Sequence, residues 1–430
     1  MLDIGVKKVL VTAPPAHWGK DLSAARLTWR VLEDLGLELF PLDILLLFNG
    51  SAQAIADHIA DIRAFAPDFA VATPNAGYAS VAWINQGGQS RNLFLDILEL
   101  PVLATWDSVV QFAHQLTKGT LPARPEESGP GMIAALRGLL NHPLMRNAAY
   151  DREQIEVMES LGVIDPGRAI HSPAFAYQAF IDHGLANPAP AAPGHDLAFT
   201  GSLWVQQSQS PVSTTAIHAK LRGPVIDERP LIQPVWPALM TAIAALPEAE
   251  RQANRLVPDQ GFFWSMALDM VSHQATTADR VRMLKAITRP VDFYGRLDGT
   301  VPGQPTPWPH IRYRGDVDME TRLPALNADT AITVDVVNRI FDRGVTCKVY
   351  SCFAAGGFCL FDHRRDFLEV VGAEGEQVMF SDADSLNERI EHFLTHPQER
   401  RELAAHLRAT IAERLSPRRI YADMITRALP

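Results

Sequence analysis

The residues best suited to bind an anion follow predicted strands in the second half of the chain. The strand in DLAFTGSLW ends at Thr200, Gly201 and Ser202. Glycine has no side chain, so a phosphate can closely approach backbone N–H groups left without strand partners at this point. An ordinary tight turn uses the same residues, and the motif alone leaves both interpretations open.

Two cationic side chains occur in comparable positions. The strand in VDFYGR ends at Gly295 and Arg296. The planar guanidinium of Arg296 could bind phosphate oxygens, and it could equally form a surface salt bridge. In CKVYSCFAAGG, Lys348 lies at the start of a predicted helix that Gly356 and Gly357 end. A helix amino terminus favours an anion, and Lys348 adds a full positive charge there.

The first half offers candidates for proton transfer. The loop PPAHWGKD, after the first predicted strand, contains His17, Gly19 and Asp21, and Asp107 ends the strand in PVLATWD. An imidazole with a pKa near neutrality can accept a hydroxyl proton. A lone loop histidine is also commonly exposed or packed without any catalytic role, so both interpretations stay open.

A metal site is not predicted. The pair Asp316 and Asp318 has a metal-site spacing in DVD but follows a turn, which favours a capping role. The cysteines, Cys347, Cys352 and Cys359, lack the close pairs typical of zinc sites and are interpreted as buried thiols.

Composition restricts the class of protein. The chain has 430 residues, 47% hydrophobic residues and a formal net charge of -10, which argues against a nucleic-acid partner. Its longest apolar stretch, LELFPLDILLLF, is interrupted by Pro41 and Asp43, so no membrane span is predicted. The amino terminus lacks the apolar core of an export signal, and three clustered cysteines form no disulfide framework. We therefore expect a cytoplasmic protein.

The elements that position these residues alternate between strands and helices. Near-continuous apolar strands separated by helices predict a parallel sheet, and ligands bind at the carboxyl ends of such strands. The proline-rich segment ANPAPAAPGH predicts a linker, which gives domains 1–190 and 191–430. Between DLAFTGSLW and PVDFYGR some eighty residues are mainly helical and are interpreted as an insert. Whether the final helices pack back on the first domain stays open.

Three local predictions in the first half can be checked individually. Ser51 caps a helix that runs to about Phe65, DFAVAT forms a short strand, and SRNLFLDIL forms a helix.

The order of motifs carries a family resemblance. HDLAFTGSLW, VDFYGR, YRGDV, CKVYSCFAAGGFCLFDHRRDF and GEQVMFSDADSLNERIEHFLTHPQERRELA follow one another as in a known family. From about residue 190 to 430 the chain resembles the two-Rossmann-domain (GT-B) glycosyltransferases, in particular the group-1-like branch with the CgeB-type spore-maturation proteins. The resemblance implies two Rossmann-like α/β domains facing across a cleft, with the helical insert in the second domain.

The resemblance also implies a function. It indicates a bacterial enzyme that moves a sugar from a nucleoside-diphosphate sugar to an unidentified acceptor, a protein, polysaccharide or lipid carrier, without metal or cofactor. The implied catalytic residues are His17, Asp107, Arg296 and Lys348. The implied substrate contacts are Gly19, Thr200, Gly201, Ser202, Gly295, Gly315, Ser351 and Gly356.

Two positions depart from the family pattern. Lys348 stands where the family usually has Arg, which keeps the charge and loses the bidentate fork. Ser351 stands where the family usually has a Glu that holds the donor ribose. An inactive nucleotide-sugar-binding or scaffold protein is therefore the alternative function. A nucleotide-sugar epimerase and a periplasmic binding protein are less well supported, because the first needs acidic and histidine clusters and the second needs export.

Overall fold

The computed structural model describes residues 7–13, 22–72, 83–86, 89–106, 132–187, 190, 192–203, 212–297, 302 and 306–429. The chain divides into two compact units, each considered by itself below. Unit 1 comprises Met1–Ser172, Val257–Trp264 and Pro417–Pro430, and unit 2 comprises Pro173–Leu256 and Ser265–Ser416.

Unit 1 is built on a parallel six-stranded sheet. Its strands, in spatial order, are β2 (Glu38–Asp43), β1 (Lys8–Ala13), β3 (Phe69–Ala72), β6 (Val102–Trp106), β7 (Met145–Ala149) and β8 (Ala169–His171). Every residue of β3 and β6 is buried, as expected for apolar strands in a sheet covered on both faces. A separate antiparallel hairpin joins β4 (Trp83–Gln86) to β5 (Gln89–Asn92).

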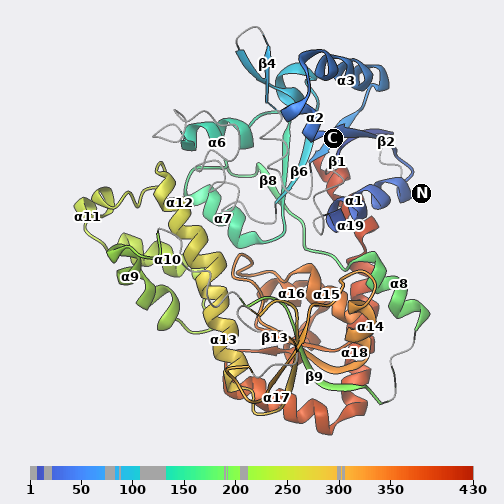
Figure 1. The fold of residues 1–430 in the computed structure, drawn as a ribbon, viewed down its shortest axis with the longest axis vertical. Coiled ribbons are helices and arrows are strands. Elements are labelled where there is room, and N and C mark those ends of the chain that lie inside the picture. The colour runs from blue at the N-terminus through green and yellow to red at the C-terminus, as the bar shows by residue number, and fades with distance from the viewer. Residues whose placement is uncertain are drawn as a thin grey trace. The chain divides into compact units, whose positions relative to one another are not determined.

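The helices of unit 1 come from both ends of the chain. They are α1 (Leu22–Asp34), α2 (Ile44–Asn49), α3 (Ala52–Phe65), η2 (Leu93–Ile97), α6 (Met132–Leu140), α7 (Arg152–Ser160) and the terminal α19 (Pro417–Ala428). Figure 1 shows α19, in red, beside α1, where the hydroxyls of Thr28 and Tyr421 are 2.7 Å apart. The Arg146 guanidinium donates to the Ala428 carbonyl, so the last helix is bonded into the first sheet.

Two of the three local predictions are confirmed and one is wrong. The Ser51 hydroxyl accepts from the Ala54 amide and caps a helix that ends at Phe65, and the Phe69–Ala72 part of DFAVAT forms β3. The helix predicted over residues 90–98 is only η2, because the residues before it pair with β4. Pairing with the strand that immediately precedes it in the sequence has overridden the helical pattern there.

Unit 2 is a second parallel six-stranded sheet. Its strands, in spatial order, are β11 (Ile311–Gly315), β10 (Val291–Tyr294), β9 (His195–Thr200), β12 (Thr330–Asp335), β13 (Cys359–Asp362) and β14 (Met379–Phe380). Counted along the chain, this order is the 3-2-1-4-5-6 arrangement of nucleotide-binding α/β folds. The predicted pair of Rossmann-like α/β units is therefore confirmed.

Helices account for much of unit 2. Those between β9 and β10 are α9 (Ala216–Arg222), η4 (Gly223–Asp227), α10 (Val235–Ala244), α11 (Glu248–Ala253), α12 (Gly261–Ala267), η5 (Leu268–Ala275) and α13 (Thr276–Ala286), although α12 belongs to unit 1 as far as Trp264. This run is the predicted helical insert. The others are α8 (Gln178–Ala186), α14 (Leu323–Ala328), α15 (Cys347–Ala354), α16 (Arg365–Val371), η6 (Ala373–Val378), α17 (Ala383–Thr395) and α18 (Pro397–Arg414).

The division between the units differs from the boundary expected at residue 190. Unit 2 begins at Pro173, and the proline-rich segment lies inside it. The reason is that α8, which precedes this segment, packs on α14 and α15. The Arg408 guanidinium of α18 also donates to the Gly184 carbonyl of α8.

Within the described residues, no helix has both the length and the apolar character needed to cross a membrane.

Candidate functional site

The carboxyl ends of β9 and β12 separate at the switch point of unit 2. These neighbouring strands remain in register as far as Phe199 and Val334. The chain leaves β9 toward one half of the sheet and β12 toward the other, so their following loops diverge. Ligands of open α/β sheets bind in the crevice outside such a point.

Lys348 spans this gap. Its Nζ donates to the Thr200 carbonyl at 2.5 Å and to Asp335 Oδ1 at 2.6 Å. It also lies 5.5 Å from the centre of the Phe199 ring, a cation–π distance. The Lys348 side chain is 26% exposed, whereas that of Asp335 is 1% exposed. The structure thus brings the predicted Lys348 and Thr200 together. It also adds the buried carboxylate of Asp335, which no sequence motif indicated.

Gly201 and Gly295, directly after β9 and β10, and Gly315, the last residue of β11, form one continuous ledge. The Gly201 amide donates to the Tyr294 carbonyl, and the Gly295 amide donates to the Gly315 carbonyl, each at 2.9 Å. A Cβ on Gly295, whose φ is +118°, would lie 2.0 Å from the Gly201 carbonyl oxygen. Only glycine fits there, and three predicted glycines therefore meet at the same edge of the sheet.

The prediction that the β9 end leaves its amides free is wrong in part. Gly201 N–H donates to the Tyr294 carbonyl at the end of β10, at 2.9 Å, and Leu203 N–H donates to the Arg296 carbonyl just after β10, at 2.8 Å. Of the Gly201, Ser202 and Leu203 amides, only that of Ser202 makes no hydrogen bond within the described structure. The Gly201 and Leu203 amides are hydrogen-bonded because the pairing between the β9 and β10 segments continues beyond Thr200.

Arg296 lies at the same edge, immediately after the ledge glycine Gly295. It is exposed, and its carbonyl accepts the Leu203 amide at 2.8 Å. Its position next to the β9 loop is compatible with a contact to a ligand above the ledge.

Ser351 and Gly356 lie away from this gap. Ser351 is fully buried, and its Oγ accepts the Tyr177 amide at 2.9 Å because α8 packs on α15. Gly356 follows the carboxyl end of α15 and lines a small pocket of about 30 Å³ with Thr330, Phe358 and other residues. Thr330 begins β12, so this pocket is at the opposite edge of the sheet from Lys348.

Three predicted residues, His17, Gly19 and Asp107, lie outside the described residues. They follow β1 and β6 in the sequence, and their roles stay predictions.

Arg280, on α13, is a second cation at the gap that the sequence did not reveal. Its Nε donates to the Val336 carbonyl at 3.0 Å and its Nη1 to the Ser202 carbonyl at 2.9 Å. Burial lowers the pKa of the Arg280 guanidinium, while the carboxylates of Asp335 and Asp362 oppose that change. No motif marks this arginine, because it lies inside a helix.

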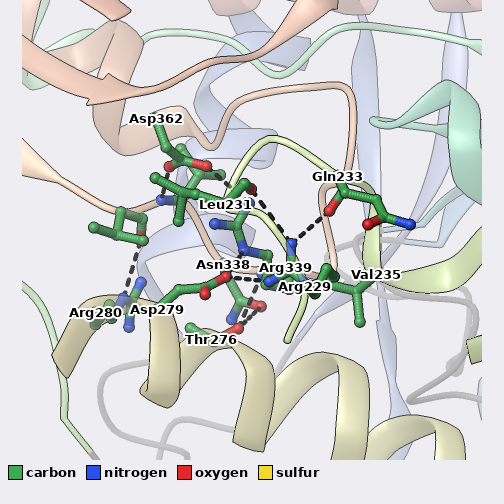
Figure 2. Close-up of polar contacts among 12 residues, drawn as sticks. Arg229, Leu231, Gln233, Val235, Thr276, Asp279, Arg280, Asn338, Arg339 and Asp362 are labelled. Carbon is green, nitrogen blue, oxygen red and sulfur yellow. Dashed lines mark hydrogen bonds and ion pairs between the residues drawn. The ribbon is translucent and has the colours of Figure 1, made fainter. Parts of the chain in front are cut away.

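A buried ion network lies beside Arg280 and is drawn in Figure 2. Asp279 Oδ2 accepts from Arg229 at 2.5 Å and from Arg339 at 2.6 Å. Asp362 Oδ2 accepts from Arg339 at 2.8 Å and from Arg364 at 2.6 Å. All five side chains are at most 2% exposed. The two carboxylates therefore bind three arginines in the interior of unit 2.

This network fixes the segment between β12 and α15. Burial alone would raise the pKa of the Asp362 carboxyl, but the Arg339 and Arg364 guanidinium groups hold it below its usual range. Asp362 Oδ1 also accepts the Val337 amide at 2.7 Å. The loop that leads to Lys348 is thus bonded to the end of β13.

The pair Asp316 and Asp318 does not assemble a metal site in the described part of unit 2. Asp318 Oδ1 accepts from the Glu320 and Thr321 amides at 3.1 and 2.7 Å, which is the predicted capping role. Across the described residues of the whole chain, no cluster of three His, Cys, Asp or Glu side chains could hold a metal ion.

Comparison with known proteins supports the resemblance seen in the sequence. Residues 279–426 match the family model described as glycosyl transferase-like. This segment begins at Asp279 and contains Arg280, Arg296 and Lys348. Together with the two Rossmann-like sheets, the match confirms the resemblance to GT-B glycosyltransferases.

Several solved structures resemble the chain over nearly its full length. T4 phage β-glucosyltransferase (BGT) with its UDP-glucose substrate has 10% identity, covers 98% of this chain and 99% of its own, and has a TM-score of 0.48. Anabaena HepE with UDP and glucose has 10% identity, coverages of 98% and 97%, and a TM-score of 0.42. Sucrose-phosphate synthase from Thermosynechococcus elongatus has 12% identity, coverages of 97% and 97%, and a TM-score of 0.47. No curated protein sequence matches the chain.

Proposed function

We propose that the chain transfers a sugar from a nucleoside-diphosphate sugar to an acceptor, with the donor diphosphate bound at the switch point of unit 2. The observation that carries this proposal is the contact of Lys348 with the β9 end, beside the glycine ledge. Lys348 itself lies in the segment that matches the glycosyl transferase-like family. The ledge lets a diphosphate approach the backbone closely, and the cations attract it.

The proposed chemistry is stabilisation of the leaving group. Breaking the glycosidic bond of the donor leaves negative charge on the nucleoside diphosphate, and preorganised cations lower the barrier for this step. We assign this role to Lys348 and Arg296. If the reaction inverts the anomeric centre, a base must take the acceptor proton, and we assign it to His17, with Asp107 as the second candidate.

The first experiment is a binding and turnover test on the full chain. UDP, GDP, dTDP and CMP are titrated by calorimetry, and the corresponding sugar nucleotides are then assayed for nucleotide release. We expect one nucleoside diphosphate to bind and its sugar donor to be consumed. No binding of any of them at millimolar concentration contradicts the proposal.

Metal independence is part of the proposal. Cationic side chains take the place of a metal, so activity is expected to survive EDTA. Complete loss on chelation, with recovery in Mn²⁺ or Mg²⁺, would refute this part alone.

An inactive nucleotide-sugar-binding protein is the second candidate, and Ser351 favours it. Its hydroxyl is buried beneath α8 at the position where the family usually presents a Glu to the donor ribose. Binding of the sugar nucleotide without any release of nucleotide, in the presence of varied acceptors, would support this candidate over the enzyme.

A further inference from the structure

Lys348 adds little net positive charge at the switch point. Its ammonium group is 2.6 Å from the buried Asp335 carboxylate, so the two charges largely cancel. Arg280 has no carboxylate within ion-pair distance among the described residues, and its bonds go to two neutral carbonyls. The Arg280 charge is therefore not held in an ion pair, and the Asp335 and Asp362 carboxylates act on it only from a greater distance.

The hydrogen bonds of Arg280 join the two diverging strand ends. One goes to Ser202, beyond β9, and the other to Val336, beyond β12. The third nitrogen, Nη2, makes no hydrogen bond in the described structure and is not fully enclosed. The guanidinium thus sets the width of the gap and keeps one donor group unused.

The Ser202 amide lies on the same side of the chain as Arg280. In an extended segment the N–H and C=O of one residue point the same way, and those of its neighbours point the opposite way. Gly201 and Leu203 donate toward β10, so the unbonded Ser202 amide is directed toward β12, as is the carbonyl that Arg280 holds. A cation and a free amide donor therefore lie at one place.

We propose that Arg280 is a positioning residue for the donor diphosphate: it holds the Ser202 segment across the switch point and supplies a positive charge there that is not held in an ion pair. This inference rests on the proposed function and adds to it a residue outside the strand-end motifs. Lys348, in this account, holds the β9 end to Asp335 as much as it attracts the ligand.

The test measures a ratio of affinities. The dissociation constants of UDP, GDP or dTDP, whichever binds the wild type, and of the matching nucleoside are measured for wild type, Arg280→Gln and Arg280→Lys. We expect Arg280→Gln to weaken diphosphate binding about 10- to 100-fold and nucleoside binding less than about twofold. Arg280→Lys, which keeps the charge, is expected to recover most of the loss.

The matched control is Arg289→Gln, which removes the same charge from an exposed ion pair with Glu391. It should leave both affinities unchanged. Equal weakening of diphosphate and nucleoside would mean that Arg280 only supports the fold, and unchanged diphosphate binding would also overturn the inference. If Arg280→Gln does not fold, Arg280→Met, which also removes the charge, carries the same ratio test with the same overturning results. A wild type that binds no nucleoside diphosphate refutes the proposed function as well.

Discussion

The two sheets share an architecture but differ at their switch points. Counted along the chain, the strand order of unit 1 is 2-1-3-4-5-6 and that of unit 2 is 3-2-1-4-5-6. The chain changes direction between β1 and β3 in unit 1, where the strands end at Ala13 and Ala72. In unit 2 the corresponding strands end at Thr200 and Asp335. The switch-point strands of unit 2 thus end in polar residues, where we propose the anion site, whereas those of unit 1 end in alanine.

The interiors of the two units also differ in how many charged residues they bury. Among the described residues of unit 1, Asp151 is the one charged residue in the buried class, and it caps α7 through the Glu153 and Gln154 amides. Unit 2 buries the network of Asp279, Asp362 and three arginines. Such networks cost desolvation energy, and this one holds the loop before Lys348 in a single position. The comparison indicates that unit 2 is organised around a fixed charged site.

The largest effect is expected from breaking this network. Asp362→Ala leaves the buried guanidinium groups of Arg339 and Arg364 without this carboxylate, which should lower the free energy of unfolding of unit 2 by about 3–5 kcal/mol. Urea unfolding measures the loss. Asp227→Ala, in an exposed ion pair with Arg222, is the control and should cost at most about 1 kcal/mol. Equal losses in the two variants would contradict the role given to the network.

The same network predicts an acid-labile unit 2. The folded-state pKa of Asp362 lies below its ordinary value of 3.8, so its contribution to stability is present above pH 3.8 and is lost as the pH falls below it. The urea midpoint should fall in this range in wild type, and the fall should be smaller in Asp362→Ala. A fall of the same size in both would assign acid lability to other groups.

A large effect on turnover is expected at the ledge. Arg296→Ala should lower kcat about 10²-fold, because the charge on the leaving diphosphate loses a cation, while the affinity for the donor falls less. Steady-state kinetics with the donor identified by titration provide the measurement. Arg312→Ala, an exposed arginine paired with Asp292, is the control. Normal kcat in Arg296→Ala would move the diphosphate away from β10.

A backbone change sharpens the comparison between the units. Gly295→Ala in unit 2 combines a φ of +118° with a Cβ 2.0 Å from the Gly201 carbonyl, and should cost about 3 kcal/mol of stability together with nucleotide affinity. Gly36→Ala in unit 1 has a φ of +83° and open space, so about 1 kcal/mol is expected. Urea unfolding and nucleotide titration of both variants measure the difference. Similar costs would show that the ledge can shift to admit a side chain.

The smallest effect is expected at Ser351. Ser351→Ala removes the 2.9 Å hydrogen bond from the Tyr177 amide and should lower stability by about 1 kcal/mol without changing nucleotide affinity. A thermal unfolding curve and a titration suffice. Loss of affinity with unchanged stability would restore the ribose contact implied by the family resemblance.

Much of the fold follows from local sequence. Ser51 caps its helix through a bond to the Ala54 amide three residues on, and the apolar runs of β3 and β6 form buried strands because each run is short and continuous. The helix predicted over residues 90–98 failed because pairing with β4 depends on a partner strand and not on helical periodicity.

The candidate site was predicted less completely. Lys348, Thr200 and the ledge glycines could be found because each follows or precedes a recognisable strand. Arg280 bonds to a residue 78 positions away, and this contact depends on the strand order of the sheet. Asp335 had one local signal, its place at the end of an apolar strand. The burial of Ser351 depends on the packing of α8 on α15, which no sequence motif predicts.

The most direct test of the central claim compares the two units by nucleotide titration. The dissociation constant of the bound nucleoside diphosphate is measured for wild type, for Lys348→Ala combined with Asp335→Asn, and for His17→Ala. The double substitution removes both partners of the ion pair, so no buried charge is left behind. We expect it to weaken binding about 10-fold or more, because the β9 end loses the bond from Lys348 to the Thr200 carbonyl and the ligand loses the ammonium group. No change is expected in His17→Ala. Unchanged affinity in the unit 2 variant together with lost affinity in the His17 variant would place the donor in unit 1 and contradict the account.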